Sequence, residues 1–311
     1  MPTVRYGNFA GEVQENESAL DALLRSGAAL AHSCKAGSCG SCLVRAVEGV
    51  VPARAQAGLK DSWKARGYVL ACVCQPEGDL TLGPVDADTQ VPARILSIDP
   101  LSQEVMRVRL TCDAPFDFRA GQFVSLLRED GLARSYSIAS LPADGFLELH
   151  IRLLPGGRMS QWIRTQAAAQ DHVRVLGPSG DCFYIPGKPE QPLLLVGTGT
   201  GLAPLYGILR DALDHGHTGP IHLLHGAVRA AGLYLQQELT ALSGGNVHYH
   251  PTLLETDGPI DQVVLRRFPP SARSRAFLCG DPAIVASLKK KLFLEGMDLR
   301  NIHADAFLPA A

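Results

Sequence analysis

The sequence lacks the features of a membrane or secreted protein. Its longest apolar stretches, such as residues 193–196, fall far short of the roughly 20 residues that a membrane-spanning helix needs. The first 13 residues contain no basic region followed by an apolar run, so they do not form a signal peptide. We therefore expect a cytoplasmic protein with no membrane partner.

The sequence also lacks a block of charge of one sign. It contains 29 lysines and arginines against 31 aspartates and glutamates, which gives a formal net charge of −2 at pH 7. Nucleic acids and anionic membranes are bound by clusters of basic residues, and none stands out here. A nucleic-acid-binding function is therefore not expected.

Repeats and low-complexity tracts are absent too, and two composition shifts divide the chain instead. Residues 83–91 (GPVDADTQV) are rich in small and acidic residues, and residues 185–192 (IPGKPEQP) hold three prolines and a glycine. A chain of 311 residues is long enough for two or three ordinary domains. We expect three, at residues 1–88, 91–188 and 190–311.

The three segments differ in their apolar patterns. In the first, leucines share one face of a helix predicted at residues 18–26, with Ser18 as its N-cap. The second contains short alternating stretches broken by turns, which indicate an antiparallel sheet or barrel. In the third, apolar strands alternate with helical stretches, as a parallel α/β sheet requires.

Eight cysteines in a chain with no sign of secretion indicate metal binding rather than disulfides. Cys34, Cys39 and Cys42 have C-x4-C-x2-C spacing, and Cys72 and Cys74 follow about thirty residues later. This is the spacing of a plant-type [2Fe–2S] site, in which one loop holds the cluster and a distant cysteine completes it. A zinc site is the alternative, but zinc ribbons normally pair two C-x2-C motifs, and one is present here.

The closing cysteine is identified by resemblance. Leu70-Ala71-Cys72, with Pro76 four residues after Cys72, is similar to the L-x-C-x-x-x-P context of the plant-type ferredoxin module. The resemblance implies that Cys72 joins the three loop cysteines as the fourth ligand. Cys74 would then be a buried free thiol.

A second motif, Arg134-Ser135-Tyr136-Ser137, resembles the R-x-Y-S motif of the ferredoxin–NADP reductase superfamily. An arginine can bind a flavin pyrophosphate with two hydrogen bonds. The resemblance places Tyr136 against the flavin and the Ser137 hydroxyl at flavin N5, where hydride arrives. Taken alone, so short a motif is also typical of an ordinary strand.

A second phosphate loop follows at the distance that the superfamily shows. Residues 150–163 (HIRLLPGGRMSQWI) lead from a strand into a helix whose N-terminal amides can hold phosphate. Together the two motifs predict FAD binding. The residues expected to bind FAD in this second loop are His150, Arg152, Gly157, Arg158, Met159 and Ser160.

A glycine-rich turn at residues 196–204 (VGTGTGLAP) follows an apolar strand. Glycines there permit a tight turn and the close approach of a pyrophosphate. Such a turn alone can be a plain β–α connection, but this one resembles the nicotinamide-binding loop of the same superfamily. The residues expected to bind the nicotinamide cofactor here are Gly197, Thr198, Gly199, Thr200 and Gly201.

Three later segments, GAVR, FLCGDP and IHADAF, carry the same resemblance. It implies that Cys279 lies beside the nicotinamide and that Phe307 approaches the flavin, so both join Ser137 as expected catalytic residues. For Phe307, a place in the core of the last strand is the alternative. The cofactor-binding residues expected in these segments are Arg229, Cys279, Gly280, Asp281, Pro282 and Phe307.

No single residue indicates whether the chain uses NADH or NADPH. The ribose rule expects an acidic residue about 20 residues past the glycine loop, but Gly226-Ala227 occupy that position. Relatives often carry an acidic residue before the Leu-Tyr pair, where this chain has Gly232. NADH is therefore expected from the resemblance to oxygenase reductases alone, with NADPH as the alternative.

The resemblance covers nearly the whole chain. It implies an α+β β-grasp ferredoxin domain, an antiparallel β-barrel FAD domain and an α/β Rossmann-like NAD domain, in the order found in reductase components of bacterial Rieske ring-hydroxylating and diiron oxygenases. A nicotinamide gives two electrons at once and a [2Fe–2S] cluster accepts one, so a flavin must stand between them. We expect a reductase that passes electrons from NADH through FAD and the cluster to an oxygenase component or a separate ferredoxin.

Two other functions share some of these features. A reductase for deoxysugar biosynthesis has the same domain order and would serve a dehydratase, so it remains the alternative. A redox sensor would use the cluster as its signal. That function leaves the flavin and nicotinamide motifs unexplained.

Overall fold

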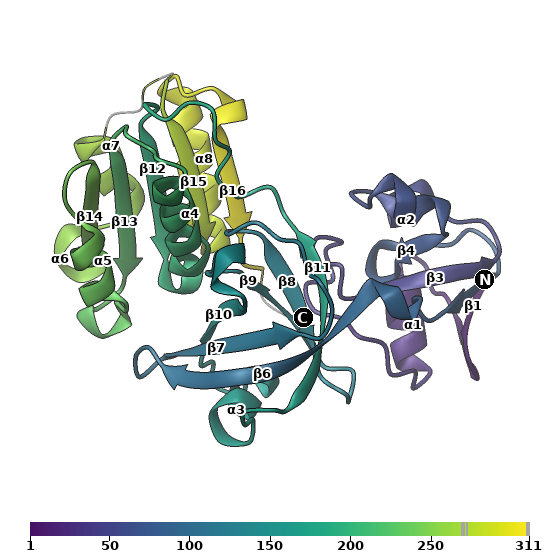
Figure 1. The fold of residues 1–311 in the computed structure, drawn as a ribbon. Coiled ribbons are helices and arrows are strands. Elements are labelled where there is room, and N and C mark those ends of the chain that lie inside the picture. Colours follow the sequence, from purple (N-terminus) through teal and green to yellow (C-terminus); the bar gives the residue numbers. More distant parts are fainter. Residues whose placement is uncertain (269–270, 272, 309–311) are drawn as a thin grey trace.

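In a computed structural model of the protein, residues 1–268, 271 and 273–308 are described. They form three β-sheets that follow one another along the chain, each with its own helices (Figure 1). The expected combination of a β-grasp ferredoxin domain, an antiparallel barrel and a parallel α/β domain is confirmed.

The first sheet is mixed, with strand order β2-β1-β5-β3-β4, because β1 lies antiparallel to β2 but parallel to β5. The helix predicted at residues 18–26 is α1, and the Ser18 hydroxyl caps it by accepting a hydrogen bond from Asp21 N at 3.1 Å. Leu20 and Leu23 of α1 are fully buried. The elements are β1 (Thr3–Tyr6), β2 (Phe9–Glu12), α1 (Ala19–Arg25), β3 (Leu43–Glu48), α2 (Asp61–Ala65), β4 (Tyr68–Leu70) and β5 (Leu80–Gly83).

The second sheet has six antiparallel strands in the order β10-β7-β6-β11-β8-β9. It curls until Ile138, just after β9, forms an isolated bridge with Leu149 in β10, so the two edge strands meet and the sheet makes a barrel. Alternate side chains fill its interior. The elements are β6 (Gln90–Pro100), β7 (Val105–Cys112), β8 (Phe123–Leu127), β9 (Ala133–Ser137), β10 (Leu147–Arg152), α3 (Arg158–Thr165) and β11 (His172–Ser179).

The third sheet has five parallel strands in the order β14-β13-β12-β15-β16, with α4 and α5 on one face and α7 and α8 on the other. The chain moves outward from β12 to β14 and then crosses to β15, so a topological switch point lies at the carboxyl ends of β12 and β15. The strands are β12 (Leu193–Thr198), β13 (Ile221–Ala227), β14 (Val247–Leu253), β15 (Arg275–Gly280) and β16 (Ile302–Ala306). The helices are α4 (Leu202–Asp214), α5 (Gln236–Leu242), α6 (Leu254–Asp257), α7 (Ile260–Arg267) and α8 (Pro282–Leu294).

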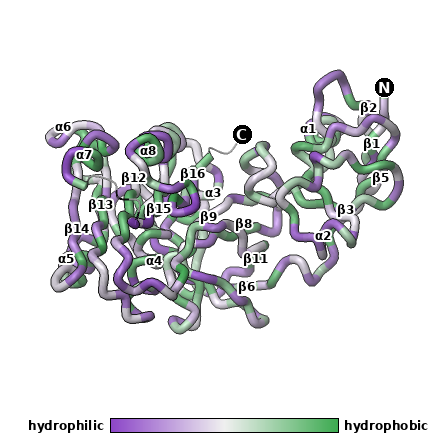
Figure 2. Tube along the Cα trace, turned by 90° about the horizontal axis from the view of Figure 1, so that it is seen from above, coloured by the Kyte–Doolittle hydropathy of each residue, from purple (hydrophilic) through white to green (hydrophobic). Residues whose placement is uncertain are grey.

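The barrel lies between the other two sheets, and Figure 2 shows the same three-part order from a second direction. On one side α4 approaches the barrel so closely that a Cβ at Gly207 would lie 3.0 Å from Ala120 Cβ. Arg210 of α4 also forms two hydrogen bonds with Asp144 of the barrel, at 2.9 and 2.8 Å. Backbone packing and a bidentate ion pair therefore fix the third sheet against the barrel.

On its other side the barrel shares an apolar core with the first sheet. The connection between them is tied down by Asp86, which accepts hydrogen bonds from Tyr68 at 2.7 Å, Arg66 at 2.7 Å and Arg45 at 3.2 Å. The barrel side chains in the shared core are Leu127, Ala133 and Leu176.

The last strand of the first sheet ends at Gly83, and the first strand of the second begins at Gln90. The second sheet ends at Ser179, and the third begins at Leu193. The domain limits at residues 1–88, 91–188 and 190–311 stay a prediction. Within the part of the chain that the structure describes, no helix has the length and apolar character to cross a bilayer.

Candidate active site

Four cysteine thiols gather in the loop between α1 and β3 and at the end of β4. The Cys34 and Cys39 thiols lie within hydrogen-bonding distance of each other, as do those of Cys42 and Cys72. Cys74 stands apart in the apolar core, where burial raises the pKa of its thiol to about 11. This grouping supports Cys72 over Cys74 as the fourth ligand.

The backbone of this loop suits an iron–sulfur cluster. Gly37 and Gly40 have φ angles of 75° and 73°, in the left-handed region that glycine adopts without strain. The Ala36 amide donates to Cys34 Sγ at 3.4 Å. A hydrogen bond from the Cys39 thiol, aided by loop amides, lowers the pKa of Cys34 to about 5. Thiolates that accept N–H hydrogen bonds are the ligands that such a cluster requires.

The four thiols interact most strongly in two pairs, Cys34 with Cys39 and Cys42 with Cys72. Among the described residues, no set of three or more His, Cys, Asp or Glu side chains is placed to hold a single metal ion. A [2Fe–2S] cluster takes two cysteines on each of its two irons, whereas structural zinc takes four ligands on one ion. The four cysteines therefore fit the two-iron cluster better than zinc.

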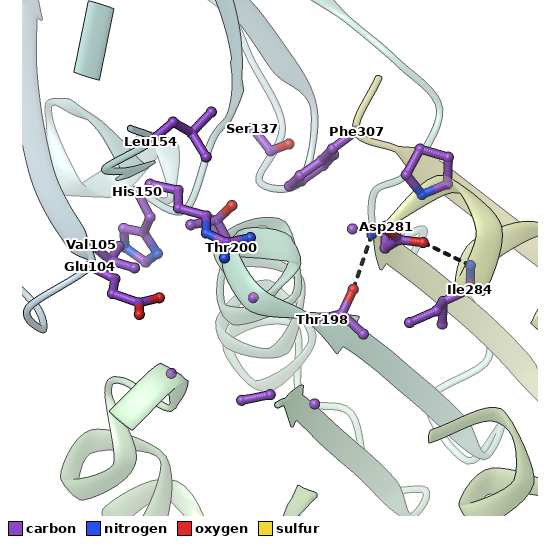
Figure 3. Close-up of a pocket in the computed structure, with 18 of the residues that line it drawn as sticks. Glu104, Val105, Ser137, His150, Leu154, Thr198, Thr200, Asp281, Ile284 and Phe307 are labelled. Atoms are coloured by element: carbon purple, nitrogen blue, oxygen red, sulfur yellow. Dashed lines mark hydrogen bonds between the residues drawn. The ribbon is translucent and has the colours of Figure 1, made fainter. Parts of the chain in front are cut away.

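A large cavity opens where the barrel meets the third sheet at its topological switch point (Figure 3). Its volume is about 1390 Å³. A site for one small ligand has about 300–1,000 Å³. The cavity is therefore large enough for a flavin dinucleotide together with the reacting end of a nicotinamide cofactor.

The barrel forms one wall of this cavity. Every residue expected to bind FAD lies on β9, on β10 or at the start of α3, and all of them line the cavity. They are Arg134, Ser135, Tyr136, Ser137, His150, Arg152, Gly157, Arg158, Met159 and Ser160. Guanidinium groups and the amides that open α3 are suited to hold a pyrophosphate, so this wall fits FAD.

The third sheet forms the opposite wall, at the carboxyl ends of its strands. The expected cofactor-binding residues that line it are Thr198, Gly199, Thr200, Arg229, Gly280, Asp281, Pro282 and Phe307. Gly197 and Gly201 lie behind this surface instead. A Cβ at Gly201 would collide with the Cys279 carbonyl oxygen, and one at Gly197 would lie 2.7 Å from Leu205 Cδ1. These two glycines let the turn pack against β15 and α4, and Thr198 Oγ1 fixes it by accepting a hydrogen bond from Asp281 N at 3.0 Å.

Ser137 and Phe307 both line the cavity, and Figure 3 draws them between His150 on one side and Asp281 on the other. The Ser137 hydroxyl donates to Asp305 Oδ2 at 3.2 Å, across 168 residues of sequence. Burial raises the pKa of Asp305 to about 6. Asp305 also lines the cavity, and it is a site residue that the sequence analysis missed. The acidic residue two positions before the aromatic Phe307 was the signal that could have found it.

Cys279 lies behind the part of the cavity that Asp305 lines. It pairs in register with Asp305 across β15 and β16, and its Sγ is 3.5 Å from Cys182 Sγ. Only 1% of Cys279 is exposed, and burial together with Cys182 raises the pKa of its thiol. Its expected catalytic role stays a prediction, because the thiol does not line the cavity described here.

His150 lines the cavity, but protein groups already occupy both of its ring nitrogens. Nδ1 is 3.1 Å from the hydroxyl of Tyr234, which lies between β13 and α5, and Nε2 is 3.1 Å from Glu148 Oε1. Arg109 donates to the same carboxylate at 2.8 Å. His150 therefore links the barrel to the connection between β13 and α5, and only its ring carbons remain to contact a cofactor.

We predict that Asp305→Asn makes the protein more stable at neutral pH. Because the folded-state pKa of about 6 lies above the ordinary value of 3.8, ionisation between these values favours the unfolded chain. The free energy of unfolding of the variant should match that of the wild type below pH 4 and exceed it by up to about 3 kcal/mol above pH 6. Urea denaturation across this range measures the difference.

Asp298→Asn is the matched control, because Asp298 has the opposite shift. Its pKa is lowered to about 2 by hydrogen bonds from Arg300, so its charged form favours the folded protein above pH 4. This variant should lose stability at neutral pH. An Asp305→Asn protein that also loses stability there would show that the carboxylate is not strained by burial.

Comparison with known proteins agrees with the geometry. Residues 8–77 match the 2Fe-2S iron-sulfur cluster binding domain family, residues 92–184 the oxidoreductase FAD-binding domain family, and residues 195–290 the oxidoreductase NAD-binding domain family. These matches follow the order of the three sheets. The three cofactors expected from the sequence are therefore those of the matched families.

Similar proteins span the whole chain. The reductase component of the naphthalene 1,2-dioxygenase system of Pseudomonas putida is 33% identical over 307 residues, which cover 93% of each chain. The crystal structure of an Amycolatopsis cytochrome P450 reductase aligns over 100% of both chains with a TM-score of 0.68 and 31% identity. A CDP-6-deoxy-L-threo-D-glycero-4-hexulose-3-dehydrase reductase from Yersinia pestis is 27% identical and covers 94% of this chain and 93% of its own. The chain thus belongs to the family of NAD(P)H-dependent iron–sulfur flavoprotein reductases that includes the ferredoxin–NAD(P)⁺ reductase components of oxygenase systems.

Proposed function

We propose that this chain takes electrons from NADH and delivers them one at a time to an oxygenase component, or to a ferredoxin that serves one. The main support is that the loop with the cluster cysteines borders the wall of the cavity that the barrel forms and that we assign to FAD. Ser33, the neighbour of Cys34, lines the same cavity as Tyr136. Arg134 Nη1 also donates to His32 O of that loop at 3.4 Å. Bound FAD supplies the conversion of a two-electron hydride into single electrons.

The residues of the cavity bind and orient rather than react. We assign Arg134 and Arg158 to the flavin pyrophosphate, since guanidinium groups bind phosphate oxygens bidentately. The Ser137 hydroxyl, held by Asp305, lies in the part of the cavity that Phe307 also lines.

NADH preference gains support from an ion pair at the rim of the cavity. Arg229, which follows β13, donates from Nε to Glu255 Oε1 at 2.9 Å. An arginine in this region can accommodate the 2′-phosphate of NADPH, whereas an acidic residue suits the free ribose hydroxyl of NADH. Glu255 of α6, which directly follows β14, therefore supplies the acidic charge that the sequence analysis did not find after β13.

We predict that Glu255→Gln narrows the preference for NADH over NADPH. Without the carboxylate, Arg229 is free to meet a 2′-phosphate and a repulsive charge is gone. Both side chains are largely exposed, and water weakens the interaction of exposed charges. We therefore expect a modest effect: the ratio of kcat/KM for NADH to kcat/KM for NADPH should fall by about fivefold. Glu295→Gln is the control. Glu295 follows the C-terminus of α8, whereas the N-terminus of this helix lies at the cavity, so this variant should leave the ratio unchanged. An unchanged ratio in Glu255→Gln would show that the ion pair between Arg229 and Glu255 does not determine the cofactor preference.

The partner is tested by reconstitution. With NADH, the protein should support turnover of a purified aromatic-ring dioxygenase, directly or through its Rieske ferredoxin. The similarity to the Yersinia pestis reductase makes a CDP-sugar dehydrase the second candidate acceptor. Turnover of the dehydrase with none of the oxygenase would assign this chain to deoxysugar synthesis instead.

A further inference from the structure

One buried serine joins the cluster loop to the barrel. Ser125 lies in β8 and is 1% exposed. Its hydroxyl donates to the Cys39 carbonyl at 3.0 Å, and it lies 3.0 Å from Ser41 Oγ and 3.1 Å from Ser135 Oγ. Cys39 and Ser41 belong to the cluster loop, whereas Ser135 lies on β9. A single side chain thus contacts both modules.

These contacts form a chain of hydroxyl groups from a cluster ligand to the flavin cavity. Ser41 Oγ lies 3.3 Å from Cys39 Sγ, and Ser135 at the other end lines the cavity. A serine hydroxyl carries one proton and two acceptor positions. Since Ser125 donates its proton to the Cys39 carbonyl, its two acceptor positions remain for Ser41 and Ser135. The hydrogen-bonding capacity of Ser125 is then fully used between the two modules.

We propose that Ser125 is a positioning residue for electron transfer from the flavin to the cluster, because it fixes the cluster loop on the flavin wall of the barrel. The proposal deepens the proposed function and rests on it. The step itself needs no further reagent, since the electron that the cluster gains is the one that the flavin loses. The apolar contacts of Leu127, Ala133 and Leu176 hold the modules together but fix no orientation. The two hydrogen bonds of Ser125 to the loop, with Cys39 O and Ser41 Oγ, set the position of the loop.

Removal of this hydroxyl should loosen the loop without disturbing the nicotinamide end of the cavity. Ser125→Ala removes the hydrogen bond to the Cys39 carbonyl and takes one partner each from the hydroxyl groups of Ser41 and Ser135, of which Ser41 is buried. The docked position then loses population to undocked ones. After anaerobic mixing with NADH, the rate of cluster reduction should fall by about tenfold, which corresponds to about 1.4 kcal/mol. The rate of flavin bleaching should stay at the wild-type value.

A second measurement does not depend on turnover. In hydrogen–deuterium exchange, the amides of residues 32–41 should exchange faster in Ser125→Ala than in the wild type. Ser140→Ala is the matched control, because Ser140 is fully buried in the same barrel and accepts a hydrogen bond from Glu148 N at 2.9 Å. It should change neither the exchange of the cluster loop nor the rate of cluster reduction.

A variant on the loop side keeps the test complete even where Ser125→Ala fails to fold. Ser41→Ala should slow cluster reduction as well, and the double variant should be no slower than the slower single one, since both remove the same chain. Wild-type rates of cluster reduction in the Ser125 or Ser41 variant would overturn the proposal, as would an equal loss in Ser140→Ala. A wild-type protein whose cluster NADH does not reduce would instead overturn the proposed function.

Discussion

Purified Cys72→Ser protein should contain no [2Fe–2S] cluster, whereas Cys74→Ser protein should keep one. The Cys72 thiol lies against that of Cys42 and faces the other cluster cysteines, while the Cys74 thiol is fully buried in the core. A serine at position 72 removes a ligand. At position 74 it places a hydroxyl among apolar side chains and costs about 1–3 kcal/mol of stability. The EPR signal of the dithionite-reduced protein should vanish in the first variant and persist in the second.

Each variant is the control for the other, because both substitutions replace a buried thiol with a hydroxyl and the two positions are only two residues apart. Iron content per chain gives the same answer independently of the reduced signal. A cluster in Cys72→Ser and none in Cys74→Ser would exchange the roles of the two cysteines. Loss of the cluster from both variants would show that the substitutions impair folding of the first domain, so the result would not identify the fourth ligand.

Electron uptake and electron delivery should separate in two variants. Cys72→Ser should still reduce ferricyanide with NADH, because this small acceptor takes electrons directly from flavin, but its reduction of cytochrome c should fall by orders of magnitude. Ser137→Ala should impair uptake instead. It removes a hydroxyl from the part of the cavity where hydride is expected, so flavin reduction in stopped flow should slow by about 10²-fold, and reduction of both acceptors with it, while cluster content stays intact.

Both assays use the full-length chain, so the barrel keeps its contacts with the first sheet. Cytochrome c reduction at the wild-type rate in Cys72→Ser would place the cluster off the path to protein acceptors. Unchanged flavin reduction in Ser137→Ala would remove this hydroxyl from the hydride site. The two results are independent of each other.

Local patterns and the family resemblance together predicted the main elements and placed expected residues on both walls of the cavity. The leucine face and the Ser18 cap predict α1, and the glycine-rich turn predicts the junction of β12 with α4. Each of these signals lies within a few residues of what it specifies. The distinction between Cys72 and Cys74 needed more, because spacing alone fits both and the family context had to choose.

The residues that the sequence analysis missed depend on contacts between distant segments. Asp305 meets Ser137 from another sheet, and Ser125 meets Cys39 across 86 residues. Glu255, to which we assign the preference for NADH, meets Arg229 across 26 residues, whereas at the position after β13 a Cβ at Gly226 would lie 2.7 Å from Ile260 Cδ1. No local motif encodes such meetings, since they arise only when the three sheets pack together.

Anaerobic titration with NADH, followed by absorption and EPR, tests the central claim most directly. The account predicts that NADH bleaches the flavin and brings up the signal of the reduced [2Fe–2S] cluster in the same protein. Two electrons for FAD and one for the cluster require about 1.5 NADH per chain for full reduction. Bleached flavin beside a cluster that stays EPR-silent, yet is reduced by dithionite, would contradict the electron path from NADH through FAD to the cluster.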